Sequence, residues 1–240
     1  MSKNKKKFIN NINYDNASWS FDGKTAKSFD KHIYNSIPFY EAMHDLALKF
    51  SDFFLSEKSF IYDLGCSTGT FIYKLNKRHN KKKHLIIGID VIKKMCDVAK
   101  TKNKKSKNVK IVNSKIENFK LKKSSLITSF FTMQFIHPSR RQKIFNKVFK
   151  SLHWGGCFML FEKVRYPDAR FQDMVSQVYF DYKLEQGFKS EAIINKSRSL
   201  KGVMEPFSTA GNIQLLKRAG FKDIVTVFKF ACFEGIIAIK

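Results

Sequence analysis

A loop that joins two glycines to two hydroxyl residues follows a short apolar segment in the first third of the chain. The apolar segment covers residues 60–64, and the loop Asp63–Gly69 reads D-x-G-x-S-x-G. Glycine lets the backbone turn tightly and approach a ligand, because no Cβ stands in the way. A helix predicted over residues 70–78 would direct free N–H groups and a partial positive charge toward that ligand. The pattern indicates a nucleotide-binding loop, although it matches neither the G-x-G-x-x-G fingerprint nor a P-loop.

Two acidic residues end the first two predicted strands. Asp63 closes the strand at 60–64, where it can accept a hydrogen bond from a loop amide or a ligand amine. Asp90 closes the strand at 85–90, and in doubly wound sheets an acid at this position binds the two ribose hydroxyls. We therefore predict a cofactor site at the carboxyl ends of these neighbouring strands.

The elements that must position these residues alternate between strand and helix. Apolar strand patterns are predicted at residues 60–64, 85–90, 109–112, 125–131 and 157–164. Helical spacing lies between most of them, which favours right-handed crossovers and a parallel sheet. Trp154-Gly155-Gly156 is expected to be a turn, and the runs 221–230 and 231–239 are expected to form a hairpin. The fold class is α/β: a Rossmann-like, doubly wound seven-stranded sheet with a C-terminal antiparallel hairpin.

The chain divides into a tail and one domain. Residues 1–20 are rich in lysine and asparagine and are expected to form a basic flexible tail. Residues 21–240 are expected to form a single domain, with N-terminal helices and a helical insertion at about 168–205. No window of about 18 apolar residues occurs, so no membrane helix is expected, and the predicted location is cytoplasmic. The four cysteines and six histidines show no metal or disulfide spacing, so no metal is predicted.

A formal net charge of +25 leaves the choice of partner open between a small molecule and RNA. Only seven of the 45 basic residues are arginine, and this lysine-rich composition is also typical of an AT-rich coding sequence. The basic clusters at 74–83 and 100–110 lie in loops expected to face away from the cofactor. Lys3–Lys7, Arg140-Arg141 and Lys189–Lys201 are better placed to guide a nucleic acid.

The strand order, the glycine loop and Asp90 together resemble a class I S-adenosylmethionine-dependent methyltransferase. The resemblance is closest to the carboxy-S-adenosylmethionine synthase family and runs from about Phe29 to Lys240. The segments that carry it are Ser36–Tyr40, Tyr62–Ser67, Ile89-Asp90, Phe131–Phe135, Gly155-Gly156, Glu162-Lys163, Lys196–Met204, Ala219–Phe221 and Gly235–Lys240. It implies S-adenosyl-L-methionine or its carboxylated form as the cofactor. With Asp63, the implied cofactor-binding residues are Tyr40, Gly65, Cys66, Ser67, Asp90, Val91, Ile116 and Phe130.

The chain departs from the family pattern at three positions. Lys115 and Phe130 replace an aspartate and an asparagine, and Ser197 replaces the arginine that holds the extra carboxylate of the cofactor. Arg198 follows one place later, but one residue turns a helical side chain by about 100°. Without that arginine, methyl transfer to an unknown acceptor is the first hypothesis.

Two other hypotheses stay open. The second is a carboxy-S-adenosylmethionine synthase that uses prephenate as carboxyl donor and supports tRNA wobble-uridine modification. The third is a non-catalytic module that binds RNA or protein. His137 and Arg198 are weak candidates for catalysis. A histidine at the position of His137 more often caps the next helix, and Arg198 is one place away from the family's arginine. Glu162-Lys163 either line the pocket or pair with each other, and the resemblance implies a possible homodimer.

Overall fold

A computed structural model describes residues 17–21, 25–55, 59–81 and 84–240. The strands are β1 (Phe60–Leu64), β2 (Leu85–Asp90), β3 (Val109–Asn113), β4 (Ser124–Phe130), β5 (Leu152–Lys163), β6 (Asp223–Phe230) and β7 (Phe233–Ile239). The helices are α2 (Thr25–Ser36), α3 (Tyr40–Ser51), α4 (Thr70–Arg78), α5 (Lys93–Lys102), α6 (Pro138–Ser151), α7 (Ala169–Glu185), α8 (Ser190–Leu200) and α9 (Thr209–Ala219). A short 3₁₀ helix, η1, covers Met133–Phe135.

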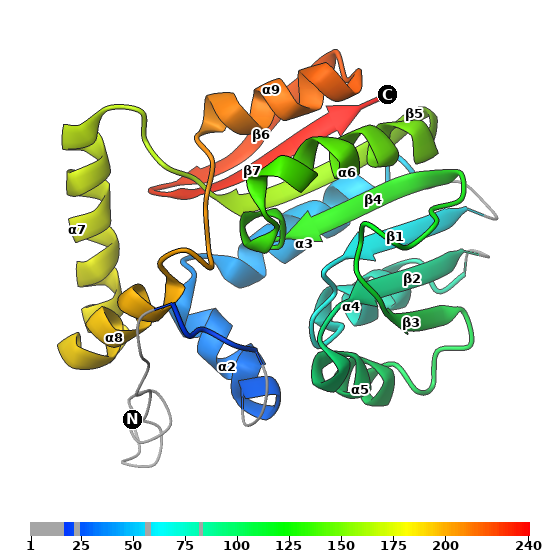
Figure 1. Cartoon of the computed structure of the whole chain (residues 1–240). Helices are drawn as coiled ribbons and strands as arrows, with labels where there is room; N and C mark the ends of the chain where they lie inside the picture. Colours follow the sequence, from blue (N-terminus) through cyan, green and yellow to red (C-terminus); the bar gives the residue numbers. More distant parts are fainter. Residues whose placement is uncertain (1–16, 22–24, 56–58, 82–83) are drawn as a thin grey trace.

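All seven strands join one sheet in the order β3-β2-β1-β4-β5-β7-β6 (Figure 1). The first five strands run parallel, and β7 pairs antiparallel with both β5 and β6. This confirms the predicted seven-stranded sheet and its C-terminal hairpin. The chain order changes direction at β1, so the carboxyl ends of β1 and its neighbours open onto a crevice where such sheets bind ligands.

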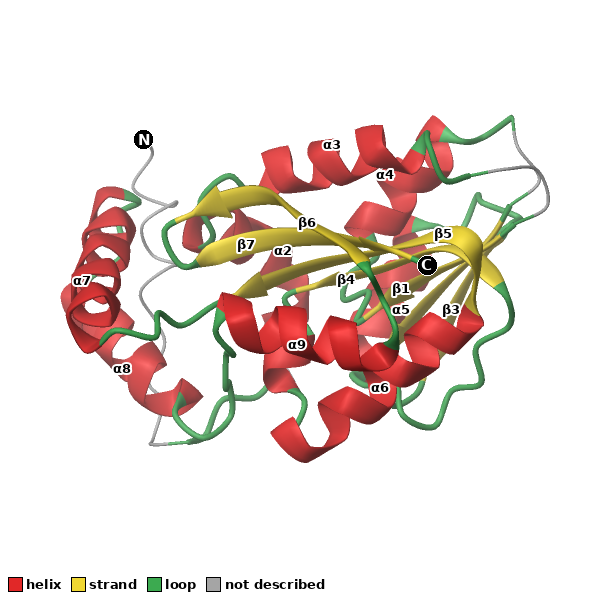
Figure 2. Cartoon of the chain, turned by 90° about the horizontal axis from the view of Figure 1, so that it is seen from above, coloured by secondary structure: helices red, strands yellow, loops and turns green. Residues whose placement is uncertain are grey.

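Helices cover both faces of the sheet, as Figure 2 shows from above. One face packs against α3, α4 and α5, with Met43, Ile72 and Cys96 fully buried. The other face packs against α6 and α9, where Phe145 and Leu216 are fully buried. The parallel strands are covered on both sides, which explains why their sequences are almost continuously apolar.

The expected turn at Trp154–Gly156 is wrong, because these residues lie inside β5. The N–H of Gly155 donates to the carbonyl of Lys240 (2.8 Å), and the N–H of Lys240 donates to the carbonyl of Gly156 (3.0 Å). The register against β4 shifts between Ser124 and Leu126. Gly155 has a φ of +74°, so the strand bends here without ending.

The segment between β5 and α9 contains α7 and α8, at the positions expected for the helical insertion. Figure 1 shows α7 standing apart from the sheet, and none of its residues is buried. Residues 17–21 run beside α8: the N–H groups of Ala17 and Trp19 donate to the carbonyls of Arg198 and Ser199. Residues 1–16 of the expected tail lie outside the described residues. Within the part of the chain that is described, no helix is both long and apolar enough to cross a bilayer.

Candidate functional site

The glycine loop is held tightly between β1, β2 and the segment after β4. The N–H groups of Gly65 and Cys66 both donate to the carbonyl of Ile89, at 2.8 and 3.0 Å. Gly65 has a φ of +79°, and a Cβ there would lie only 2.0 Å from Oγ1 of Thr132. The loop therefore needs glycine both for its backbone conformation and for its close approach to Thr132.

Asp90 joins the end of β2 to this loop through its carboxylate. Oδ2 accepts from the N–H of Ser67 and Oδ1 accepts from the N–H of Ile92, both at 2.8 Å. Burial raises the pKa of Asp90, and the backbone N–H groups oppose the rise. Each carboxylate oxygen can accept more than one hydrogen bond, so Asp90 can still bind two ribose hydroxyls.

Asp63 lies deeper, at the end of β1. Its Oδ1 accepts from Oγ1 of Thr128 at 2.8 Å. Burial raises the pKa of Asp63 to about 7, while the bond from Thr128 and the nearby Asp90 have opposing smaller effects. A ligand ammonium group beside this carboxylate would offset its desolvation by direct charge pairing.

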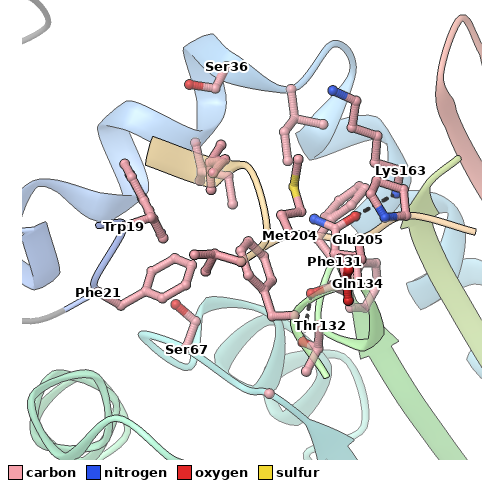
Figure 3. Close-up of a pocket in the computed structure, with 18 of the residues that line it drawn as sticks. Trp19, Phe21, Ser36, Ser67, Phe131, Thr132, Gln134, Lys163, Met204 and Glu205 are labelled. Carbon is pink, nitrogen blue, oxygen red and sulfur yellow. Dashed lines mark hydrogen bonds between the residues drawn. The ribbon is translucent and has the colours of Figure 1, made fainter. Parts of the chain in front are cut away.

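One cavity of about 1140 Å³ joins these groups, and part of its lining is shown in Figure 3. This volume slightly exceeds the usual range for small-molecule sites, about 300–1000 Å³. The structure brings all nine sequence-predicted cofactor residues to its wall: Tyr40, Asp63, Gly65, Cys66, Ser67, Asp90, Val91, Ile116 and Phe130.

These residues fit S-adenosyl-L-methionine, which when bound would supply a methyl group activated by a sulfonium. The aliphatic side chains of Val91 and Ile116 suit the adenine, Asp90 suits the ribose, and Asp63 suits the amino group. The Cys66 thiol is buried, and burial raises its pKa well above the usual value, so Cys66 packs in the loop without acting as a nucleophile.

An aromatic wall faces the glycine loop. Phe130, which stands in place of the family's asparagine, stacks on Phe161 with ring centroids 4.6 Å apart. Tyr40 lies 4.4 Å from the ring of His44 and 6.0 Å from that of Phe131. Burial raises the pKa of the Tyr40 hydroxyl, so Tyr40 is a neutral hydrogen-bond donor. Tyr40, Phe130 and Phe131 thus form an aromatic part of the cavity lining.

The two candidates for catalysis occupy different settings. Nδ1 of His137 accepts from the N–H of Ser139 (3.3 Å), which makes His137 the N-cap of α6. This is the capping role that the sequence favoured. Ser197 and Arg198 are both exposed in the last turns of α8 and both line the cavity. The carboxylate-binding role of Arg198 stays a prediction.

Two contacts at the site were not anticipated. Nζ of Lys102 donates to Oδ2 of Asp30 (2.6 Å) and to Oγ1 of Thr68 (3.3 Å), which ties α2 and α5 to the glycine loop. Glu162 accepts from three successive N–H groups, those of Thr132, Met133 and Gln134, at 2.9–3.0 Å. Glu162 therefore neither lines the pocket nor pairs with Lys163, but holds the segment after β4.

The buried Glu162 predicts a change of stability with pH. Burial raises its pKa to about 8, from a usual value of 4.5, although the three N–H groups and Arg141 oppose the rise. Between these values the folded chain holds a proton that the unfolded chain has released, so stability falls as pH rises. We expect the free energy of unfolding of the wild type to fall relative to Glu162→Gln from pH 5 to 8, as measured by urea denaturation.

Above pH 9 this difference should become constant. The control is Glu191→Gln, which removes an exposed carboxylate on α8 and is measured over the same pH range. A difference for Glu162→Gln that stays flat from pH 5 to 8 would mean that the N–H groups outweigh burial and keep the pKa of Glu162 at or below its usual value.

Arg141 is not available to guide a nucleic acid, contrary to expectation. Its guanidinium is buried, donates through Nε to the carbonyl of Ile136 (2.7 Å) and lies 4.3 Å from the ring of Phe207. Its neighbour Arg140 is exposed and pairs with Glu117 at 3.6 Å. The arginine pair was predicted from adjacency in sequence, but on a helix adjacent residues point in different directions.

Comparison with known proteins places this chain in a family. Residues 61–156 match the family model described as a methyltransferase domain. A carboxy-S-adenosyl-L-methionine synthase of Staphylococcus epidermidis is 37% identical over 230 residues, covering 95% of this chain and 100% of that protein. The synthase of Helicobacter pylori is 34% identical and covers 94% and 95% of the two chains.

Solved structures support the fold. A putative S-adenosylmethionine-dependent methyltransferase of Methanococcus maripaludis has a TM-score of 0.60 at 17% identity, covering 94% of this chain and 96% of that one. Human N-acetylserotonin methyltransferase, solved in complex with SAM, has a TM-score of 0.56 at 17% identity, with coverages of 90% and 59%. The chain has the class I methyltransferase fold, and by its match along nearly the whole of both chains it belongs to the carboxy-S-adenosyl-L-methionine synthase family.

Proposed function

We propose that this chain is a carboxy-S-adenosyl-L-methionine synthase, which transfers the ring carboxylate of prephenate to the sulfonium methyl carbon of S-adenosylmethionine. The methyl carbon loses a proton, prephenate loses hydroxide and becomes phenylpyruvate, and the proton and hydroxide leave as water. The observation that carries the proposal is a single cavity that holds all nine predicted cofactor residues and continues beyond them to α7 and α8. Its lining extends beyond the nine predicted cofactor residues, which leaves room for a second small molecule beside the cofactor. The full-length similarity to synthases supports the same choice.

In this proposal the chain's own residues bind and orient the two reactants. Asp90 accepts from the ribose hydroxyls, Asp63 pairs with the amino group, and the glycine loop lets the backbone approach. Tyr40 donates a hydrogen bond to the cofactor from its hydroxyl. Placing both reactants in one cavity converts their encounter into a step within a complex.

Methyl transfer to an unidentified acceptor is the second candidate, and one observation favours it. Ser197 stands where the family has an arginine for the cofactor carboxylate, and the neighbouring Arg198 is exposed in the last turn of α8. A serine hydroxyl provides no charge for a carboxylate. RNA as acceptor draws no support from Arg141, which is buried.

Mass spectrometry separates the candidates. We expect the purified chain, given S-adenosylmethionine and prephenate, to form a product heavier by one carboxyl group, and to form none without prephenate. A parallel incubation with S-adenosylmethionine and tRNA tests methyl transfer. S-adenosylmethionine that stays unchanged with prephenate, while tRNA gains methyl groups, would contradict the proposal. Failure to bind S-adenosylmethionine at millimolar concentration would leave only the non-catalytic hypothesis. The homodimer and the cytoplasmic location stay predictions.

A further inference from the structure

Three lysines gather at the end of the cavity far from the glycine loop. Lys163 is the last residue of β5, Lys183 lies in the last turn of α7, and Lys196 lies in α8. All three line the cavity, and Figure 3 shows Lys163 across it from Ser67. They are separated in sequence, so the folding of the helical insertion against β5 is what brings them together.

Aromatic rings lie against the ammonium groups of this lysine cluster. Nζ of Lys163 and Nζ of Lys183 lie 4.5 and 4.0 Å from the ring centroid of Tyr179. The Tyr179 hydroxyl donates to the carbonyl of Ser36 at 2.8 Å, which holds the ring in place. Nζ of Lys196 lies 4.8 Å from the ring of Trp19 and within hydrogen-bond reach of Nε2 of His32. Ring faces attract ammonium groups, so the aromatic residues position the three charges.

The cluster lacks a counter-ion among the described residues. The described carboxylates on the cavity wall are Asp63, Asp90, Glu117 and Glu205. Neither these nor any other described carboxylate forms an ion pair with Lys163, Lys183 or Lys196. Each ammonium group has three N–H donors and no acceptor, so the cluster presents several donors for an anion.

Electrostatic repulsion within the lysine cluster also favours a bound anion. Burial lowers the pKa of Lys183 to about 7, and the nearby Lys163 lowers it further. Burial also lowers the pKa of Lys196 to about 7, with further lowering by Lys183 and Lys163. A bound anion would relieve this mutual repulsion. Since none of the three lysines is fully exposed, a small anion suits them better than a polyanion.

We propose that Lys163, Lys183 and Lys196 form the subsite that binds the carboxylates of the second substrate. The inference rests on the proposed function and names the residues that would bind prephenate, the carboxyl donor. Three cations, two at the ring of Tyr179 and one at the ring of Trp19, match a compact dicarboxylate better than a monocarboxylate, since two negative charges balance more of the cluster. The apolar side chains of Val175 and Phe233, which line the same cavity, suit a hydrocarbon ring between the carboxylates.

Calorimetry tests the subsite. The full chain is saturated with S-adenosylhomocysteine, which carries no methyl group to react, and is titrated with prephenate. We expect Lys183→Met and Lys163→Met each to weaken prephenate binding by about tenfold or more, through loss of charge-assisted hydrogen bonds. Binding of S-adenosylhomocysteine should change by less than about twofold, because its binding residues are distant. Phenylpyruvate, with one carboxylate, should bind the wild type more weakly than prephenate does.

Two further variants serve as controls. Lys183→Arg keeps the charge and should retain most of the affinity for prephenate. Lys217→Met removes an exposed lysine on α9, outside the cavity, and should change nothing. Thermal unfolding of each variant shows that a loss of binding is not a loss of fold.

The outcomes distinguish this inference from the proposed function. Prephenate binding that needs the lysines, without a carboxylated product, would support the subsite and contradict the synthase. A carboxylated product from the wild type, with unchanged prephenate binding by Lys183→Met and Lys163→Met, would overturn the subsite. No binding of prephenate to the wild type would overturn it as well. If the lysine variants lose affinity for carboxy-S-adenosylmethionine and not for prephenate, the lysines bind the product carboxylate and the inference is wrong.

Discussion

Replacing Gly65 by alanine should lower the free energy of unfolding by about 3 kcal/mol or more and abolish cofactor binding. Gly65 has a φ of +79°, which is costly for any residue with a Cβ. The new methyl group would also lie 2.0 Å from Oγ1 and 2.4 Å from Cγ2 of Thr132. Neither atom can withdraw freely, because the N–H of Thr132 is bound to Glu162. Urea denaturation and calorimetry with S-adenosylmethionine measure the two effects.

Gly187→Ala separates the cost of a positive φ from the cost of the clash with Thr132. Gly187 has a φ of +86°, but a Cβ there would meet no atom within 4 Å. The substitution should therefore cost only the backbone term, about 1–2 kcal/mol, and leave cofactor affinity unchanged. If Gly65→Ala costs no more than Gly187→Ala, the close approach to Thr132 is not what requires glycine in the loop.

Asp90→Ala should weaken S-adenosylmethionine binding by about 1–3 kcal/mol, or roughly 5- to 150-fold in Kd. The substitution removes the carboxylate that we propose accepts from the ribose hydroxyls. It also leaves the N–H groups of Ser67 and Ile92 without the bonds that shape the loop. Calorimetry of the full chain measures the affinity directly.

Two substitutions refine this result. Asp90→Asn keeps one acceptor oxygen without the charge, so its affinity should lie between those of the wild type and Asp90→Ala. Asp97→Ala removes an exposed carboxylate on α5, outside the cavity, and should bind like the wild type. An Asp90→Ala variant that binds as tightly as the wild type would show that the ribose lies elsewhere.

The side of the cavity lined by the nine predicted cofactor residues could be predicted because its sequence signals are local. The loop Asp63–Gly69 and the acid Asp90 each follow directly from a strand pattern, and parallel strands bring their carboxyl ends to one edge. The alternation of strand and helix similarly led to the correct sheet. All of the predicted cofactor residues line one cavity for this reason.

The lysine end of the cavity could not be predicted, because it depends on contacts between segments that are distant in sequence. Lys163, Lys183 and Tyr179 belong to two elements whose separate sequences carry no sign of a shared site. Arg141 appeared to be a surface cation, but packing with Phe207 buries it. Trp154–Gly156 has the composition of a turn, yet pairing with the end of β7 keeps it in a strand. In each case tertiary packing overrides the local preference.

The position of β7 between β5 and β6 has a consequence for how the domain assembles. β6 pairs with β7 alone, so it has no place in the sheet until β7 has docked against β5. The residues that meet in that pairing, such as Cys157 and Ile239, are far apart in the chain. Closing so long a loop costs more chain entropy than forming the β1–β2, β2–β3 and β4–β5 pairings, whose residues lie closer together in sequence. We therefore expect the hairpin to join after those pairings, and until it does the apolar edge of β5 is open to pairing with other chains.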